Sequence, residues 1–403
     1  MVNMDKETYI KKEAQYHIQT YKRFPIIFVQ GFGSRLWDIN DKEYLDFVSG
    51  LGVCSTGHCH PKVVDSVRKS VGQLMHVSNL FYTLPQIDLA ERLAQISFGG
   101  KVFFCNSGAE ANEGAIKLAR KYTRMNFGED RYEVITAYRS FHGRTFKTLA
   151  ATGQPDKQKP FEPLPPGFKH VHLNDIDALV DAISDKTGAI LLEPIQGEGG
   201  VYECEYDYLK KVREICDEYQ LLLILDEVQT GLGRTGKMFG YEHYDIEPDI
   251  ITLAKGLAGG LPIGCFIAKE EVARDFEYGD HATTFGGGVV PCSAALAVLN
   301  VIEEEMLIEN CARVGSYLKE QLSSLSARFH FKEIRGKGLM IGVELAKPIA
   351  SLIVQRCLEQ GIVLNHIGNN IIRFLPPLCI TQEEMDEGLT IFEKALEDIG
   401  EGK

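Results

Sequence analysis

The sequence has no excess of positive charge and no long apolar run. Its 403 residues include 43 lysines and arginines against 56 aspartates and glutamates, a formal net charge of −13. This balance argues against nucleic acid or an anionic membrane as the general partner, so an anionic ligand would need local arginines. No apolar stretch approaches the roughly 20 residues of a transmembrane helix. We therefore expect neither a nucleic-acid-binding protein nor a membrane protein.

A secretory leader and a compact cysteine framework are also missing. The first residues, MVNMDKETYIKKE, are polar and contain no apolar core. Ten cysteines are spread along the chain without the spacing of a small disulfide-bonded domain. We therefore expect free thiols and a cytoplasmic location. The segment CSTGHCHP (54–61) suggests zinc, but adjacent residues cannot easily converge on one tetrahedral ion, so we predict no metal site.

What the chain does contain is an alternation of short apolar strands and amphipathic helices. KVFF (101–104) precedes a helical pattern, and YLKKVREICDEY (208–219) is amphipathic at helical spacing. Strands that are apolar on both faces and separated by helices are typical of an α/β fold with a mostly parallel sheet. The proline-rich stretch 152–167 indicates an ordered loop. Further strands are predicted at 133–137, 189–192, 221–225, 250–254 and 263–268.

The pattern changes after about residue 300. A helix at 291–304 leads into two more helical segments, short strands at 339–345 and 371–375, and a last helix near 382–398. This order indicates a separate α+β unit. A chain of this length is expected to form about two or three structural units.

The stretch LLLILDEVQTGLGRTGK (221–237) fits three kinds of site. Its strand ends in acids, as in an ATPase; GLGRTG matches a dinucleotide fingerprint; and with Lys237 it approaches a phosphate loop. A phosphate loop needs Ser or Thr after the lysine, and Met238 follows instead. The fingerprint needs glycines directly between a strand and a helix, which this context lacks. We interpret Gly233 and Gly236 as loop glycines; a nucleotide-dependent ATPase or dehydrogenase is the alternative from another class.

Asp226 stands at the carboxyl end of a fully apolar strand, where parallel sheets bind ligands. Strand alternation sends Asp226 and Val228 to one side and Glu227 to the other, so only one of the two acids can serve a ligand there. An acid that merely emerges into solvent is the alternative.

Two further segments favour a site over that alternative. After the strand at 101–104, Ser107 and Glu110 have capping-box spacing at a helix start, whose free N–H groups suit a phosphate, although a well-capped helix alone explains the pattern. A second apolar strand ends on Lys255, 29 residues after Asp226, a workable distance for a strand–connection–strand unit. A phosphate cup, a carboxylate and a lysine together suit pyridoxal phosphate (PLP), with a Schiff base at the lysine and the carboxylate at the ring nitrogen.

Seven motifs make the sequence resemble the class III aminotransferases of fold type I, especially the acetylornithine and ornithine types. They are GHCHP, CNSGAEANE, FHGRT, EPIQGEGG, LDEVQTGLGRTG, LAKGLAGGLPIG and TTFGGG, and the resemblance runs from TYKRFP to IIRFLPPL. It implies an α/β large domain, residues 51–300, with a mostly parallel seven-stranded sheet flanked by helices. A smaller α+β domain would combine residues 1–50 and 301–403.

The resemblance also implies the cofactor-binding residues. Lys255 would carry PLP and then shuttle a proton as general acid and base, while Asp226 would hold the pyridine nitrogen protonated. Thr284 would reach the phosphate from the neighbouring subunit, which makes a homodimer part of the active site. The other positions implied are Ser107, Gly108 and Ala109 in the phosphate cup, Gln229 at the 3′ oxygen, and Phe141 and Val228 on the two ring faces, where core packing is the alternative.

Four residues would contact the substrates by the same resemblance. Arg144 of FHGRT would hold the α-carboxylate of an ornithine-type substrate. Arg373 lies in an apolar strand, where an arginine needs a partner, and would bind the carboxylate of glutamate or 2-oxoglutarate. Glu198 would cover Arg373 while the ω-amino substrate is bound. Tyr21 would contact substrate, with N-terminal packing as the alternative.

The implied reaction is transfer of the 5-amino group of N2-acetylornithine to 2-oxoglutarate by a ping-pong mechanism, in arginine biosynthesis. Ornithine, succinylornithine, succinyl-diaminopimelate and 4-aminobutyrate are alternative amino donors. One departure from the family pattern follows Thr284, where GGGVVP (286–291) replaces the common GGNP. The helix that follows Thr284 therefore starts differently from the family pattern, at the place where subunit contacts are expected.

Overall fold

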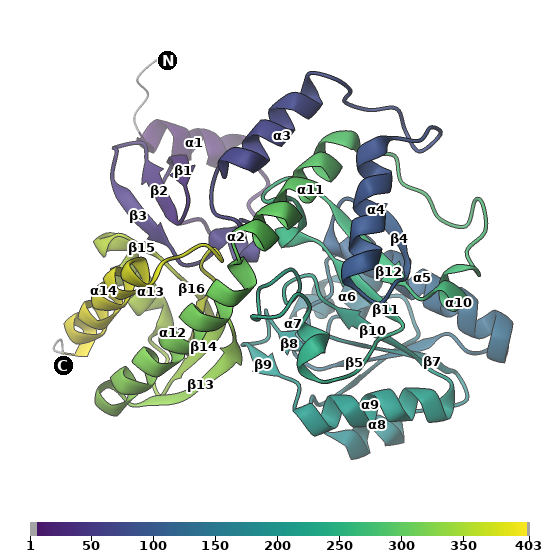
Figure 1. Cartoon of the computed structure of the whole chain (residues 1–403). Coiled ribbons are helices and arrows are strands. Elements are labelled where there is room, and N and C mark those ends of the chain that lie inside the picture. Colours follow the sequence, from purple (N-terminus) through teal and green to yellow (C-terminus); the bar gives the residue numbers. More distant parts are fainter. Residues whose placement is uncertain (1–5, 401–403) are drawn as a thin grey trace.

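The structure, a computed structural model, describes residues 6–400. A seven-stranded sheet forms the centre of the larger part (Figure 1). Strand β12 runs antiparallel to both of its neighbours, and the other pairings are parallel. The strand order is β4 (Lys101–Cys105), β12 (Gly264–Ala268), β11 (Ile250–Leu253), β10 (Leu222–Asp226), β7 (Thr187–Leu192), β5 (Glu133–Ala137) and β6 (Phe168–Val171).

Helices lie on both faces of this sheet (Figure 1). Every predicted strand and the predicted helix at 208–219 is present, with ends shifted by at most two residues. The elements of this part are α3 (Pro61–Val71), α4 (Leu84–Ile96), α5 (Gly108–Phe127), α6 (Phe146–Ala151), α7 (Pro155–Gln158), η1 (Lys159–Phe161), α8 (Ile176–Ala182), the ribbon of β8 (Ile195–Gln196) and β9 (Tyr202–Glu203), α9 (Tyr206–Tyr219), η2 (Gly240–His243), η3 (Lys255–Ala258), α10 (Glu270–Ala273) and α11 (Val289–Glu304).

Successive side chains of the central strands pack into two different apolar cores. Leu223 and Leu225 of β10 share a core with α4 and α11, whereas Leu222 and Ile224 share a core with α5. Because strand side chains alternate between faces, both faces of β10 are buried. Asp226 continues the series of Leu222 and Ile224, so its side chain lies on the α5 side.

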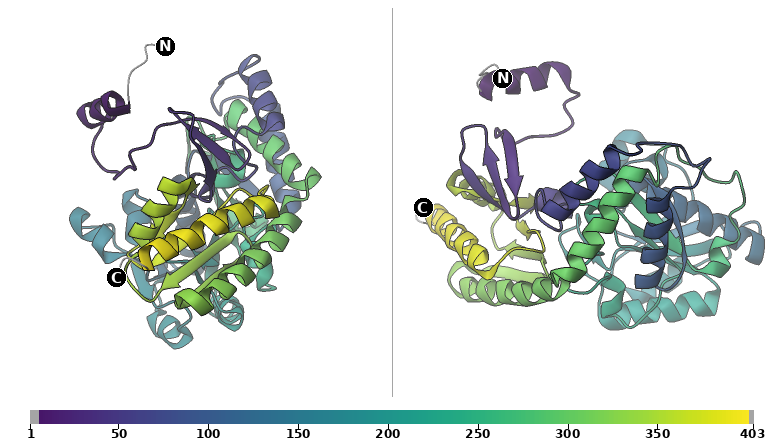
Figure 2. Two further views of the ribbon diagram at one scale, coloured as in Figure 1. Left: turned by 90° about the vertical axis from the view of Figure 1, so that its left-hand side faces the viewer. Right: turned by 45° about the horizontal axis from the view of Figure 1, so that its top comes forward.

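The smaller part combines the two ends of the chain (Figures 1 and 2). One four-stranded sheet has the order β13-β14-β17-β16, and another joins the N-terminal strands β1, β2 and β3 to β15. Its elements are α1 (Lys6–Tyr16), β1 (Phe28–Phe32), β2 (Arg35–Asp38), β3 (Glu43–Asp46), α2 (Ser49–Gly52), α12 (Leu307–Phe329), β13 (Phe331–Lys337), β14 (Met340–Leu345), α13 (Ala350–Gln360), β15 (Ile362–Val363), β16 (Asn365–Ile367), β17 (Ile371–Phe374) and α14 (Gln382–Gly400).

Helix α1 lies at the surface. It has no buried residue and lies off the rest of the chain in both views of Figure 2. Within residues 6–400 no helix is both long and apolar enough to cross a bilayer.

Candidate active site

One cavity of about 450 Å³ opens at the carboxyl ends of the central strands. Strands β10 and β11 are neighbours there, while β12 separates β11 from β4. The cavity brings together ten of the thirteen residues predicted for the site: Ser107, Gly108, Ala109, Phe141, Arg144, Glu198, Asp226, Val228, Gln229 and Lys255.

Asp226 and Glu227 diverge as strand alternation predicts. Asp226 and Val228 line the cavity. Glu227 points away and accepts hydrogen bonds from the N–H groups of Gly240, at 2.9 Å, and Tyr241, at 2.7 Å. Burial raises the pKa of Glu227 to about 7, although these hydrogen bonds by themselves would lower it. The acid after Asp226 is therefore a structural group that shapes the loop.

Two residues that sequence reasoning missed hold the Asp226 carboxylate in place. Asn112 Nδ2 donates to Asp226 Oδ2 at 2.7 Å, and His142 Nδ1 lies 2.8 Å from the same oxygen. Asn112 Oδ1 in turn accepts from Thr252 Oγ1 at 2.8 Å. A buried asparagine inside the apolar stripe of α5 was the available signal for Asn112. His142 carried none, because only the fold brings it to Asp226.

Lys255 follows β11 in an unusual backbone conformation, with φ of +40°. A non-glycine residue in this region is strained, and such strain is held by the surroundings. The next residue, Gly256, has no room for a side chain, because a Cβ there would lie 2.5 Å from Ser55 Oγ. Burial lowers the pKa of Lys255, while the charge of Glu198 opposes that change and the charge of Arg373 adds to it.

Arg373 lies fully buried behind the cavity and meets Glu198 at its wall. The Arg373 Nη1 atom is 2.8 Å from Glu198 Oε1 and donates to Gln229 Oε1 at 3.3 Å. Burial alone would raise the pKa of Glu198, but the charges of Arg373 and Lys255 outweigh it and lower that pKa to about 2. The expected partner of Arg373 in its apolar strand is therefore Glu198.

Glu193 is a further buried acid that the sequence did not single out. It accepts hydrogen bonds from the N–H groups of Phe141, at 2.9 Å, and Gly197, at 3.2 Å. Burial raises the pKa of Glu193. The carboxylate thus joins the loop that carries Phe141 to the loop that carries Glu198.

The start of α5 forms half of the predicted capping box. Ser107 Oγ accepts from Glu110 N at 3.2 Å, as expected. The Glu110 carboxylate, however, accepts from the N–H of Asn106 at 2.5 Å rather than from that of Ser107. The reciprocal hydrogen bond of the capping box is therefore made to the residue before Ser107. At Gly108 a Cβ would lie 2.8 Å from Val228 Cγ1, so glycine is needed for the close approach of these two walls.

Two predicted residues, Thr284 and Tyr21, lie outside the cavity of their own chain. Thr284 lines a small separate pocket with Asn79 and Phe285. Tyr21 is 71% exposed, and its ring faces the Arg23 guanidinium at 5.2 Å. Their roles stay predictions, and the role of Thr284 was expected across a subunit boundary.

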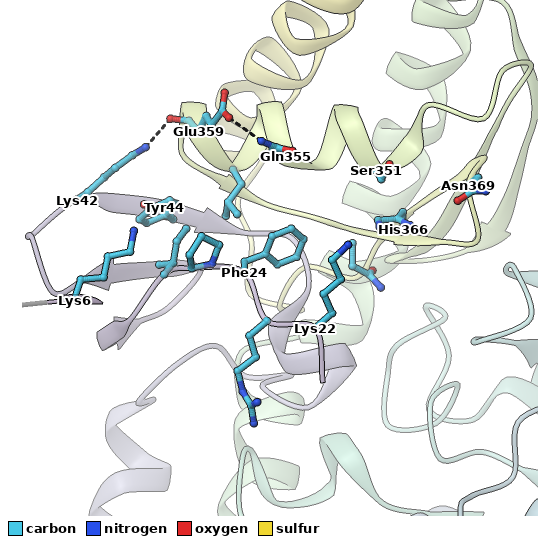
Figure 3. A pocket seen from close by; sticks show the side chains of 15 residues that line it. Lys6, Lys22, Phe24, Lys42, Tyr44, Ser351, Gln355, Glu359, His366 and Asn369 are labelled. Atoms are coloured by element: carbon cyan, nitrogen blue, oxygen red, sulfur yellow. Dashed lines mark hydrogen bonds between the residues drawn. The ribbon is translucent and has the colours of Figure 1, made fainter. Parts of the chain in front are cut away.

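A larger cavity of about 930 Å³ lies elsewhere, between the N-terminal segment and α13. Figure 3 shows Lys22, Lys42 and Tyr44 facing Gln355 and His366 across it. No residue of the predicted site lines this cavity. The glycines of GLGRTG do not open a helix either, because η2 begins only at Gly240. Neither feature supports a nucleotide site.

Comparison with known proteins identifies the family. The profile of class III aminotransferases matches residues 16–396. The chain belongs to the class III aminotransferases. Members of this class depend on PLP.

Three relatives show how far the similarity extends. An acetylornithine aminotransferase of Caldanaerobacter subterraneus subsp. tengcongensis is 54% identical, over 97% of this chain and 99% of the relative. One from Methanocaldococcus jannaschii is 51% identical, over 98% and 100%. A solved Toxoplasma gondii ornithine aminotransferase, with PLP partly occupying its active site, superposes with a TM-score of 0.94 at 33% identity, over 100% of this chain and 96% of that one.

The cavity of this class III aminotransferase suits PLP. The Gln229 Nε2 atom is buried and has no hydrogen-bond partner among residues 6–400, as expected for a group that awaits a ligand oxygen. Asp226 keeps its Oδ1 atom for one bond from the N–H of Val228, at 3.1 Å, which leaves it room for a ring nitrogen. The first N–H groups of α5 lack partners within the helix and suit a phosphate.

Proposed function

We propose that this aminotransferase moves the 5-amino group of N2-acetylornithine to 2-oxoglutarate, giving N-acetylglutamate 5-semialdehyde and glutamate. The observation that carries the proposal is one cavity that holds Lys255 and Asp226 and ends at the Arg373–Glu198 pair. The similarity to acetylornithine aminotransferases, at 54% and 51% identity, selects this donor over ornithine, succinylornithine, succinyl-diaminopimelate and 4-aminobutyrate. The physiological role would be arginine biosynthesis.

The residues of the cavity divide the work of holding the cofactor. Ser107, Gly108 and Ala109 would bind its phosphate, Gln229 its 3′ oxygen and Asp226 its ring nitrogen, while Phe141 and Val228 would contact the two faces of the ring. Bound PLP supplies an electron sink next to the carbon that loses its proton. The bonds from Asn112 and His142 occupy Oδ2 of Asp226 and keep the carboxylate turned toward the ring position.

Lys255 would hold the cofactor and, when released, move the proton. Burial lowers the pKa of Lys255, which favours the neutral amine at Nζ, the form that would accept the proton from the reacting carbon. The positive φ at Lys255 sets the direction in which its side chain leaves the backbone.

Arg144, Arg373 and Glu198 would sort the two substrates. Arg144 stands at the cavity wall and would hold the α-carboxylate of acetylornithine, with Tyr21 as a further contact. Glu198 pairs with Arg373 in this structure, which hides the second carboxylate site. When Glu198 moves aside, Arg373 would bind the carboxylate of 2-oxoglutarate. Two unlike substrates could then use one cavity in alternate half-reactions.

A homodimer with shared active sites belongs to this proposal. Large apolar side chains are exposed along residues 71–87 and at Phe285, parts of the chain that line a small pocket with Thr284, and such patches mark subunit interfaces. They are Val71, Leu74, Met75, Leu80, Phe81, Tyr82, Leu84, Ile87 and Phe285. All ten cysteines are free, which supports a reducing compartment such as the cytoplasm.

Half-reactions of the PLP-loaded enzyme test the donor. N2-acetylornithine, ornithine, succinylornithine and 4-aminobutyrate are mixed in turn with the loaded enzyme, and the loss of its absorption band is followed. We expect acetylornithine to react fastest. Faster reaction with any other donor rejects the substrate assignment. Absence of a borohydride-sensitive band, or its persistence in Lys255→Ala, rejects the whole proposal.

A further inference from the structure

A further polar cavity, of about 620 Å³, lies beside the C-terminal half of α5 and shares no lining residue with the active-site cavity. Figure 1 shows this end of α5 at the edge of the molecule, beside α10. Five cations and only two carboxylates line it in a chain whose net charge is −13. The charged lining residues are Lys117, Arg120, Lys121, Arg124, Lys147, Glu129 and Asp280.

The two carboxylates do not neutralise these cations. Asp280 pairs with Lys121 at 2.5 Å, and the Asp280 carbonyl accepts from Lys117 at 2.9 Å. Lys121 also lies 3.6 Å from a Glu277 carboxylate oxygen, whereas Glu129, Arg124 and Lys147 make no ion pair within residues 6–400. The nearby Glu113 carboxylate accepts instead from Thr145 Oγ1, at 2.6 Å, and from the N–H of Lys147. Arg124 and Lys147 therefore have no direct ion pair among the described residues, while the Glu113 charge acts on Arg120 and Lys147 from nearby and opposes the lowering of the pKa of both by burial.

Arg120 is held rigidly with donors to spare. Its guanidinium lies 5.1 Å from the Phe168 ring centroid and 5.9 Å from that of Tyr132. Nη2 donates to the Pro166 carbonyl at 3.2 Å, while the buried Nε atom has no partner among the described residues. Burial lowers the pKa of Lys147, and the like charges of Arg120 and Lys117 add to that change, while the charge of Glu113 opposes it. These cations repel one another, and a bound anion would relieve that repulsion.

The helix macrodipole does not explain the cluster. Cations stabilise a helix C-terminus only within about its last turn. Helix α5 ends at Phe127, so Arg124 alone qualifies. Lys117 and Arg120 lie further back, and Lys147 belongs to α6.

We propose that this cavity binds a small anion carrying two or more negatively charged groups, phosphate or carboxylate. The planar arginine fork suits either group in bidentate fashion, and the surrounding lysines accommodate the second charge. The site stands independently of the proposed amino donor.

Calorimetric titration of the PLP-loaded enzyme with pyrophosphate, and separately with citrate, tests the site. We expect saturable binding of at least one of them, and the tighter one identifies the class of ligand. The double variant Arg120→Gln/Lys147→Gln should raise the dissociation constant by about ten-fold or more. Lys147→Gln alone serves if the double variant unfolds.

Lys211→Gln is the matched control. It removes one positive charge from α9, where Lys211 pairs with Glu214 on the surface, and should change the dissociation constant by less than about two-fold. Equal weakening by this control would show a general charge effect and overturn the proposal. So would the absence of saturable binding with either anion, or release of PLP by pyrophosphate, which would place the binding in the active-site cavity.

Discussion

At the scale of single residues, Gly197 leaves the space that the Gln229 side chain occupies. A Cβ at residue 197 would lie 1.9 Å from Gln229 Oε1. Gly197→Ala should therefore displace Gln229 from the cavity and weaken PLP binding by about ten-fold or more, which fluorescence titration of the apoprotein measures. Gly72→Ala is the control, because its Cβ would find its nearest neighbour at 3.5 Å. Equal PLP affinity in Gly197→Ala and the wild type would contradict this placement of Gln229.

The charge of Glu198 gives a second prediction at this scale. Its pKa is lowered from 4.5 to about 2 in the folded chain, so its ionised form adds stability above about pH 4.5, and that stability is lost as the pH falls toward 2. The difference in unfolding free energy between wild type and Glu198→Gln should be constant from about pH 5 to 8 and shrink below. Denaturant titrations at several pH values measure it. Glu214→Gln, in an exposed ion pair, should change the free energy of unfolding little at any of these pH values. A stability difference for Glu198→Gln that grows in acid would contradict the pairing of Glu198 with Arg373.

Sequence patterns could identify those side chains whose position follows from one strand or helix. Alternation along β10 separated Asp226 from Glu227, and the contacts of both acids agree. His142 and Glu193 could not be found this way. Each acts on a residue more than 30 positions distant or on a neighbouring loop, and only the packed sheet brings those partners together.

At the scale of elements, the start of α5 depends on the Ser107 side chain. Its hydroxyl caps the N–H of Glu110 at 3.2 Å. Ser107→Ala should lower the unfolding free energy of the apoprotein by about 1 kcal/mol, and Ser107→Gly by only a few tenths of that. Urea unfolding without PLP isolates this effect from phosphate binding. Equal losses in the two variants would mean that the cap contributes nothing and that α5 is fixed by packing alone.

The sheet illustrates which element properties a sequence carries. Apolar runs in the sequence predicted six of the seven strands of the central sheet. The exception is β6, whose residues are of mixed polarity and mostly half-buried. Strand direction was harder, because an apolar run reads the same either way. For β12 the length of the connection indicates the direction. Only ten residues separate Leu253 from Gly264, fewer than a parallel crossover needs, and β12 is antiparallel to β11.

At the scale of the whole molecule, the exposed surface indicates what a single chain lacks. Helix α1 buries no residue, and Phe81 and Tyr82 are 67% and 94% exposed beside the loop that carries Thr284. The division into domains at residues 50 and 300 stays a prediction, although β3, before residue 50, pairs with β15, after residue 300. Because Phe81 is exposed in an apolar patch, Phe81→Glu should yield monomers in sedimentation experiments and remove activity. Lys211→Gln should leave the dimer intact.

Mixing two inactive variants decides whether the active site is shared. If Thr284 serves the partner's cofactor, a heterodimer of one Lys255→Ala chain and one Thr284→Ala chain contains one intact site, because the intact Lys255 and the intact Thr284 meet across the interface. Random reassociation makes about half of all dimers of this kind, so about a quarter of wild-type activity should return. If both residues serve the same chain, every site keeps one defect and activity stays at the level of the unmixed variants.

Arg144→Ala mixed with Lys255→Ala is the control. Both residues line one cavity within a chain, so each site of this heterodimer keeps one defect and the mixture should recover no activity. We expect activity to return in the mixture of Lys255→Ala and Thr284→Ala chains, because Thr284 lies outside the active-site cavity of its own chain.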